Sequence, residues 1–287
     1  MLEKKKRNLL ILGIVFIGLM VFFTFADLNV ALWIYNPESL FGRFFQIVGT
    51  LPLNIVGVFS TVALVMTAEY KFNLSTIVSY VLGALLLMFF GFYGCLSFAN
   101  ALPEGEIVIT VATVGWVFLS IVLVGFIMKS GNTKALRKAA IIGVIGCAAA
   151  VFGPMMIKDF MSRPRFNTLE NPVEQFTYWF QRMPQTATSS NSSFPSGHSA
   201  QSALSLCALL VPMFVKKWDN QKYYKAAGWI AGGFTVCVMV SRMVLGAHYG
   251  TDVLVGAMLT TTAIAIVDIC LAKKEKLTEK GLSLDKR

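Results

Sequence analysis

The sequence predicts an all-α integral membrane protein, a bundle of about eight transmembrane helices with its polar motifs at the non-cytoplasmic surface. Hydrophobic residues make up 56% of the 287 residues and charged residues only 14%, against roughly 25% in soluble domains. The mean hydropathy is +0.66. The apolar residues also form runs of membrane-spanning length that basic residues separate.

The candidate spans, in chain order, are residues 9–25, 53–68, 76–98, 107–128, 139–157, 198–215, 226–245 and 253–272. Four basic residues precede the first run, but the run is long for a cleaved signal peptide and no small-residue cleavage site follows it. We therefore expect a retained first span. Residues 27–50 mix aromatic and polar side chains, which suits a segment in the membrane interface. Pro52 and Asn54 interrupt the second span, and the sixth is short and rich in serine.

The basic residues orient the bundle. Most of the 25 Lys and Arg fall in segments that share a side with the N-terminus when eight spans are drawn. Because Lys and Arg in short loops stay in the cytoplasm, both termini are predicted inside and the long polar segment 158–197 outside. We expect a multi-pass protein of the bacterial plasma membrane with its site on the outer face.

Composition also argues against other classes of protein and site. The basic residues punctuate apolar runs and form no basic face on a soluble fold, so nucleic acid is not an expected partner. The cysteines lie inside apolar runs without metal-ligand spacing, which indicates small core residues and not disulfides or a metal site: Cys95, Cys147, Cys207, Cys237 and Cys270.

Three cations follow the fifth span at its outer end: Lys158, Arg163 and Arg165. Cations placed outside need a reason to be there, and a bound anion supplies one. Arg presents a planar fork of donors to phosphate, and Lys acts as a point charge. A solvated juxtamembrane cluster is the plainer alternative.

The run Pro195-Ser196-Gly197-His198 stands directly before the sixth apolar stretch. Ser196 can cap that helix, Gly197 lets the backbone approach a ligand closely, and the helix N-terminus favours an anion. His198 would lie at the rim of this anion site, where an imidazole can exchange a proton near neutral pH. A capped helix with an interfacial histidine is the alternative.

Arg242, His248 and Asp252 lie around the junction of the last two spans. If that turn is helical, the four-residue spacing places His248 and Asp252 on one face. Asp252 would then accept a hydrogen bond from one imidazole nitrogen and leave the other as a nucleophile. A polar pair that ties two helix ends together is the alternative.

Together these three stretches resemble the motifs of the type 2 phosphatidic acid phosphatase family, a superfamily that also includes vanadium haloperoxidases. Lys158 and Arg165 match Lys-x6-Arg-Pro, residues 195–198 match Pro-Ser-Gly-His, and Ser241, Arg242, His248 and Asp252 match Ser-Arg-x5-His-x3-Asp. Phe166 departs from the pattern, because the family has proline there. The resemblance covers residues 158–272, and members commonly have six spans.

The resemblance implies roles for these residues. His248 would attack phosphorus to form a phosphohistidine, with Asp252 orienting it, and His198 would protonate the leaving oxygen and later activate water. Phosphoryl oxygens would be held by Lys158, Arg165, Arg242, Ser196 and Gly197. Arg163 is an additional candidate contact outside the family positions. No carboxylate cluster is present for paired metals, so no metal or other cofactor is expected.

The expected partners are the bilayer and a lipid phosphate or pyrophosphate. An aromatic-rich stretch, residues 171–183, would lie at headgroup level beside the site, and an isoprenoid carrier pyrophosphate, phosphatidylglycerol phosphate or phosphatidic acid would fit. We expect N-terminal helices of unassigned role over residues 1–138, a phosphatase core over 139–272 and a basic tail over 273–287. A transporter and a non-catalytic lipid-phosphate-binding protein are the alternatives. Asp268 is the only acidic residue expected well inside a span.

Overall fold

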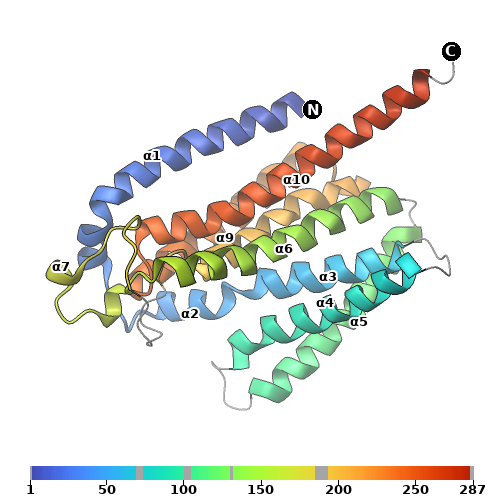
Figure 1. Ribbon diagram of the computed structural model, residues 1–287. Coiled ribbons are helices and arrows are strands. Elements are labelled where there is room, and N and C mark those ends of the chain that lie inside the picture. Colours follow the sequence, from blue (N-terminus) through green and yellow to red (C-terminus); the bar gives the residue numbers. More distant parts are fainter. Residues whose placement is uncertain (1, 69–73, 100–104, 130–131, 185–192, 285–287) are drawn as a thin grey trace.

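The computed structural model describes residues 2–68, 74–99, 105–129, 132–184 and 193–284, and in these ranges the chain is helical with no strand (Figure 1). The helices are α1 (Leu2–Ile34), α2 (Leu40–Val48), α3 (Leu51–Met66), α4 (Leu74–Ala99), α5 (Gly105–Lys129), α6 (Thr133–Met161), η1 (Phe166–Thr168), α7 (Pro172–Gln175), α8 (Gly197–Ser202), η2 (Ala203–Met213), η3 (Lys216–Trp218), α9 (Gln221–Val244) and α10 (Gly250–Leu284). The predicted all-α membrane fold is confirmed.

The membrane-spanning character is clear from length and composition. Six helical segments of the described ranges are long and apolar enough to cross a bilayer: Lys5–Ile34, Leu40–Met66, Thr110–Lys129, Thr133–Met161, Gln221–Val244 and Gly250–Thr278. The sixth predicted stretch, residues 198–215, is different in kind, because a short α8 passes directly into the 3-10 helix η2. The chain is therefore a multi-pass membrane protein.

Two sequence expectations need correction at the N-terminal side. Residues 27–34 belong to α1 and residues 40–48 form α2, and both fall within candidate spans, so most of the stretch 27–50 is not a separate interfacial segment. Asp27 consequently lies inside a candidate span and is 2% exposed. Asp268 is thus not the only carboxylate within a span.

Pro52 and Asn54 do not break the second span, for two local reasons. Pro52 occupies the first turn of α3, where a backbone N–H would have no partner within the helix. The side-chain amide of Asn54 donates to the carbonyls of Phe90 and Gly91 on α4, at 3.2 and 3.4 Å. The polar group therefore joins two helices inside the apolar layer.

The core lies where α6 packs between α3 and α10, and small residues allow the close approach. A Cβ on Gly143 would lie 2.1 Å from Ser60 Oγ of α3, and one on Gly146 would lie 3.0 Å from the Ile264 side chain of α10. Such small residues are how membrane helices gain packing contacts. The central helix α6 is therefore tightly packed on both sides, and its last turn carries the start of the first motif.

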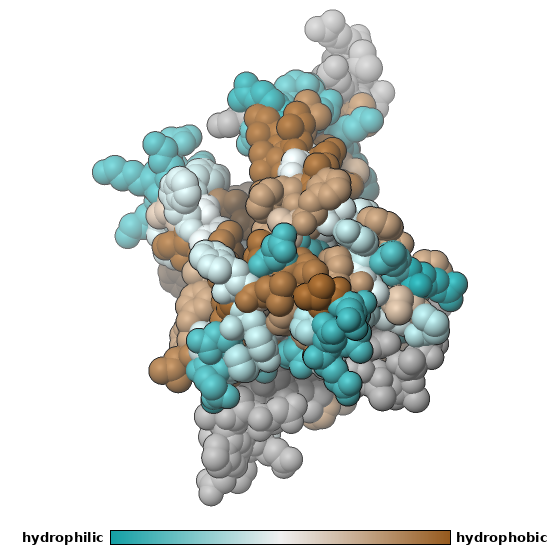
Figure 2. Space-filling view, turned by 90° about the vertical axis from the view of Figure 1, so that its left-hand side faces the viewer, coloured by the Kyte–Doolittle hydropathy of each residue, from teal (hydrophilic) through white to brown (hydrophobic). Residues whose placement is uncertain are grey.

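The two ends of the bundle differ. Figure 1 shows both chain termini at one end and α7, with the loops around it, at the other. Figure 2 faces the α7 end, where hydrophilic side chains gather around an apolar area. All three sequence motifs lie in elements that meet at this end.

Candidate active site

The first motif begins in the last turn of α6 and then changes direction. Lys158 lies in that turn, where a cation is favoured by the helix C-terminus. Ser162 ends the helix in the left-handed conformation, with φ of 49°. The chain beyond it is extended at Arg165, and Phe166 packs edge-on against Tyr35 and Tyr249. The phenylalanine that replaces the family's proline thus anchors the loop by packing.

The second motif is a capped turn that rests on α10. The Ser196 hydroxyl accepts a hydrogen bond from the Ser199 N–H at 3.3 Å, which confirms the predicted cap of α8. The Ser196 N–H donates to the Asp252 carbonyl at 2.9 Å. A Cβ on Gly256 would lie 2.2 Å from the Ser196 carbonyl oxygen, so the turn and α10 are in direct backbone contact.

The third motif folds around the end of α9. Arg242 lies in the last turn, and its carbonyl accepts the N–H groups of Ala247 and His248 at 3.1 and 3.2 Å. Gly246, with φ of +65°, makes the sharp turn between the helices, a backbone conformation that favours glycine. This turn presents His248 two residues before α10 begins at Gly250.

His248 is oriented by a backbone carbonyl, contrary to the expectation that Asp252 binds it directly. Its Nδ1 lies 2.6 Å from the Ser193 carbonyl oxygen and 3.8 Å from the nearer Asp252 oxygen. Because a carbonyl can only accept, Nδ1 carries the proton and the lone pair is on Nε2. Nε2 is therefore still free to act as the predicted nucleophile. The group that binds Nδ1 is the Ser193 carbonyl and not Asp252.

The imidazole of His248 is enclosed by protein, 3% exposed. Burial lowers its pKa to about 4, and Asp252 opposes this only in part. At neutral pH the ring is therefore uncharged. A neutral imidazole with its second nitrogen fixed by a hydrogen bond is the form required of a nucleophile.

Asp252 lies further from the imidazole because other donors hold it. Its Oδ1 accepts from Arg163 Nη1 at 2.5 Å, and its Oδ2 accepts from the Ser193 hydroxyl at 2.5 Å and the Tyr249 N–H at 2.8 Å. The Tyr249 contact also caps α10 from within. Asp252 therefore fixes both segments that flank the His248 ring, the one at Ser193 and the turn at Tyr249.

Arg163 is placed differently from the expectation of a phosphate contact. The residue is fully buried, and each guanidinium nitrogen donates to protein: Nε to the Thr177 carbonyl, Nη1 to Asp252 and Thr251, and Nη2 to Asp27. Arg165, two residues further along, is only partly buried. Arg163 is an internal counter-ion of the site.

The remaining cations converge on the two histidines. Lys158, Arg165 and Arg242 lie within electrostatic reach of one another and of His198. Arg242 is 6% exposed, and its Nε and Nη1 have no hydrogen-bond partner among the described residues. Buried donors without partners are costly, so an anion that accepts from them would be bound strongly.

Residues that sequence reasoning missed stand behind the motifs: Asp27, Thr177, Ser193, Tyr249 and Thr251. Only Asp27 had a usable signal, as a lone carboxylate beside an apolar run that demands a buried partner. In the described ranges, no group of three or more His, Cys, Asp and Glu is arranged to hold a metal ion.

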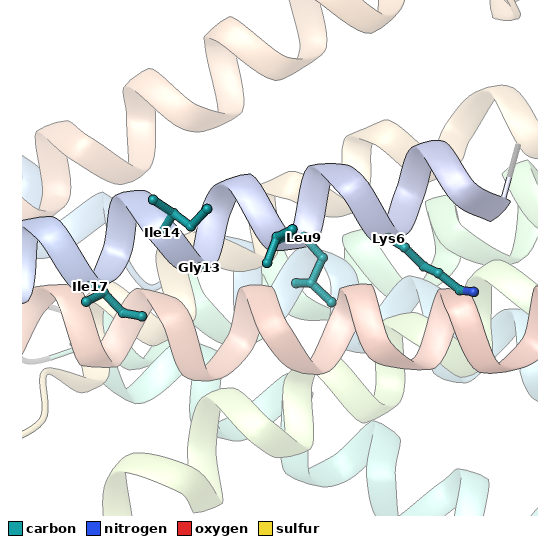
Figure 3. A pocket seen from close by; sticks show the side chains of 6 residues that line it. Lys6, Leu9, Gly13, Ile14 and Ile17 are labelled. Carbon is teal, nitrogen blue, oxygen red and sulfur yellow. The ribbon is translucent and has the colours of Figure 1, made fainter.

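An apolar groove of about 400 Å³ lies elsewhere, along the N-terminal half of α1 (Figure 3). Its lining residues all come from that helix: Lys6, Leu9, Leu10, Gly13, Ile14 and Ile17. Apart from one lysine, they offer no group for the chemistry of phosphate. The reactive groups are those of the three motifs.

Of the comparisons with known proteins, one gives a match. Residues 134–276 match the family model described as the PAP2 superfamily, a segment that contains all three motifs. No curated protein and no solved structure matches the chain.

Proposed function

Because residues 134–276 place this chain in the PAP2 superfamily, which supports phosphatase activity on phosphate esters, we propose that it hydrolyses a lipid phosphate or pyrophosphate through a phosphohistidine. The observation that carries the proposal is the state of His248. Its Nδ1 is held by the Ser193 carbonyl, and burial lowers the pKa of the ring to about 4. The nucleophile is thus ready at neutral pH.

In the first step, His248 Nε2 attacks phosphorus, so that a P–N bond forms while the bond from phosphorus to the leaving oxygen breaks. His198, in its protonated form, gives the leaving oxygen a proton. Burial and the neighbouring cations lower the pKa of His198, and the negative charge of a bound phosphoryl group opposes this and favours the protonated ring. In the second step, His198 takes a proton from water, the water oxygen attacks phosphorus, and the P–N bond breaks. The products are inorganic phosphate and the dephosphorylated alcohol, or a monophosphate from a pyrophosphate.

The cations hold the phosphoryl oxygens. Arg242 offers two buried donors, and Lys158 and Arg165 add charge where the transition state becomes more negative. Ser196 and Gly197 lie at the N-terminal end of α8. A Cβ on Gly197 would meet no protein atom within 4 Å, so no protein neighbour requires glycine there, whereas close approach by a phosphoryl group does.

The segment 171–183 favours a lipid over a soluble substrate. Val173, Tyr178 and Phe180 are 65%, 39% and 56% exposed, which suits insertion among lipid headgroups. Trp179 instead stacks on Phe194, next to the second motif. Val173, Tyr178 and Phe180 therefore form an exposed apolar rim, and Trp179 packs the same segment against the second motif. An isoprenoid carrier pyrophosphate, phosphatidylglycerol phosphate and phosphatidic acid are the substrates we propose, with the isoprenoid carrier first.

Phosphate release from purified protein in detergent tests the proposal. We expect kcat/KM to be at least about tenfold higher for a long-chain lipid phosphate or pyrophosphate than for a short soluble phosphate ester, because only the lipid contacts the apolar rim. His248→Ala is the matched control and should release no phosphate. Equal kcat/KM values for the two substrate types would refute recognition of the lipid tail, and release by His248→Ala would refute the nucleophile.

A further inference from the structure

We propose that Asp27 of α1 is a positioning residue of the active site, so that the helix outside the PAP2 match completes the catalytic unit. This inference rests on the proposed function. Among the described residues, Asp27 hydrogen-bonds to Arg163 and Thr251 and not to His248. It acts through Arg163 and Thr251, which in turn fix Asp252 and the start of α10.

The Asp27 carboxylate is buried and hydrogen-bonded through both of its oxygens. The carboxylate is 2% exposed. Its Oδ1 accepts the Thr251 N–H at 3.0 Å, and its Oδ2 accepts the Thr251 hydroxyl and Arg163 Nη2, the latter at 3.1 Å. A buried carboxylate is tolerated only with such partners, because its desolvation is costly.

Asp27 and Asp252 share one guanidinium. Arg163 donates Nη1 to Asp252 and Nη2 to Asp27, and its plane lies over the Tyr249 ring at 4.0 Å. The two carboxylates together therefore fix the orientation of the guanidinium. Without Asp27, Nη2 of Arg163 has no carboxylate partner. The guanidinium is then no longer held in the orientation in which Nη1 donates to Asp252.

Asp27 also acts as a cap supplied by another helix. Thr251 is in the first turn of α10, where backbone N–H groups lack partners within the helix and a negative charge is favoured. His248 lies three residues before Thr251, and Asp252 directly follows it. Asp27 thus fixes the N-terminal end of α10, to which the loop that carries His248 is joined.

Packing around Asp27 keeps α1 in place at this end. A Cβ on Gly250 would lie 2.0 Å from the Phe23 ring, so α1 and the start of α10 are in close contact. The Trp179 indole N–H donates to the Thr24 hydroxyl at 2.9 Å. The same turn of α1 therefore contacts α10 and the aromatic segment.

The chain offers a matched control at the other end of the same helix pair. Lys5 of α1 pairs with Asp268 of α10 at 2.5 Å, remote in sequence from all three motifs. Like Asp27, this pair joins α1 to α10 by a charged contact. If Asp27 only docks the helix, then Lys5→Gln and Asp27→Asn should have similar effects.

The experiment measures phosphoenzyme formation in the purified full chain, mixed rapidly with the lipid phosphate that it hydrolyses. Samples are quenched under alkaline denaturing conditions, because phosphohistidine is labile in acid. The final amplitude counts competent sites, and the rate constant reports chemistry in those sites. Inhibition by inorganic phosphate reports the cation cluster separately, and His248→Ala provides the baseline.

For Asp27→Asn we expect a rate constant per competent site about 10- to 100-fold lower, the range seen when a hydrogen-bond partner that orients a metal-binding side chain is removed. The inhibition constant for inorganic phosphate should stay within about twofold of wild type, because the phosphate-binding cations are untouched. Lys5→Gln should match wild type in both. Should Asp27→Asn fail to fold, Thr251→Val removes one hydroxyl from the network and should slow the step about two- to tenfold.

Several results would overturn the inference. A wild-type rate constant in Asp27→Asn would do so, as would an equal loss in Lys5→Gln or a parallel loss of phosphate inhibition. Where Asp27→Asn does not fold, a wild-type rate in Thr251→Val has the same meaning. Absence of any phosphate release by wild-type protein would instead refute the proposed function, and the inference with it.

Discussion

At the scale of the residue, the tautomer of His248 is set by a carbonyl group. A carbonyl accepts at every pH, so the proton on Nδ1 does not depend on the ionisation of Asp252. Asp252 contributes from one step further away, through Ser193 and Tyr249. This separates two tasks, orientation of the ring and support of the loop, that a directly bonded carboxylate would combine.

The first prediction from this geometry concerns the proton affinity of His248. Burial lowers its pKa to about 4, so the neutral ring should persist as pH falls through the ordinary range near 6.5 and be lost only around pH 4. NMR of histidine-labelled protein in detergent tests this, because the chain has only two histidines. We expect the His248 signal to be flat from about pH 8 to about pH 5.

His198→Gln assigns the two signals by removing one of them. A His248 signal that titrates near 6.5 would contradict an enclosed, neutral imidazole. The functional counterpart is that protonation of His248 should not limit kcat/KM until the pH approaches the same low value, since the protonated ring has no lone pair on Nε2.

The site residues that could be predicted are those whose spacing in the sequence matches a motif. Motif spacing located both histidines, Arg242 and the Ser196 cap. It did not separate Arg163 from Arg165, because both are arginines of one short segment and only the fold shows that Arg163 is fully buried and Arg165 partly exposed. The Ser193 carbonyl was invisible for another reason: any residue type supplies a backbone carbonyl, so sequence gives no signal for it.

At the scale of the element, α10 carries the site by backbone contact with the second motif. Gly256 lies one turn beyond Asp252, and the Ser196 carbonyl of the capped turn rests on it. The Ser196 N–H donates to the Asp252 carbonyl on the same helix. The distance between the turn of His198 and the loop of His248 is thus set by the absence of a side chain at one position.

We therefore predict that Gly256→Ala lowers both activity and stability. Its Cβ would lie 2.2 Å from a backbone oxygen, which cannot rotate away, so the capped turn must shift. Overpacking of this kind costs about 1–3 kcal/mol. Thermal unfolding in detergent and phosphate release measure the two effects, and we expect the activity loss to exceed the loss of folded protein.

Gly233→Ala in α9 is the matched control for that variant. A Cβ there meets no atom within 4 Å, and alanine favours a helix over glycine by about 0.5–1 kcal/mol. The control should therefore unfold at the wild-type temperature or slightly above it. Equal behaviour of the two variants would show that contact with Ser196 does not matter.

The predicted elements agree best where apolar runs are long. Each of the predicted stretches is helical over most of its length, but the ends and the types of helix differ. The helix α1 continues past Asp27 to Ile34, beyond the apolar run predicted at residues 9–25. Residues 203–213 form a 3-10 helix, and an apolar run by itself does not distinguish this from an α-helix.

At the scale of the whole molecule, the N-terminal helices belong to the same bundle as the family segment. α3 packs on α6 through Gly143 and Ser60, and α1 packs on α10 at Gly250. Sequence motifs mark only the segment that carries chemistry. The division into residues 1–138 and 139–272 remains a proposal about roles, and these contacts bear on it because both parts share one core.

The last prediction is the orientation of the bundle in the membrane. Figure 1 places the two termini at one end and α7 at the other, and basic residues are concentrated near the termini. The positive-inside rule then puts the termini in the cytoplasm and the active site outside. Cysteine labelling in intact cells tests this, in a background without the five native cysteines.

Two exposed positions report the two ends: Glu174 in α7 and Lys276 near the end of α10. A membrane-impermeant maleimide should label Glu174→Cys in intact cells and Lys276→Cys only after permeabilisation. Phosphate release by each variant serves as the check that it is folded. The reverse pattern would place the active site in the cytoplasm, and the substrate would then have to be a phosphate exposed on the inner leaflet. Labelling of both positions in intact cells would contradict the prediction, because the two opposite ends of the bundle (Figure 1) would then both be accessible from outside.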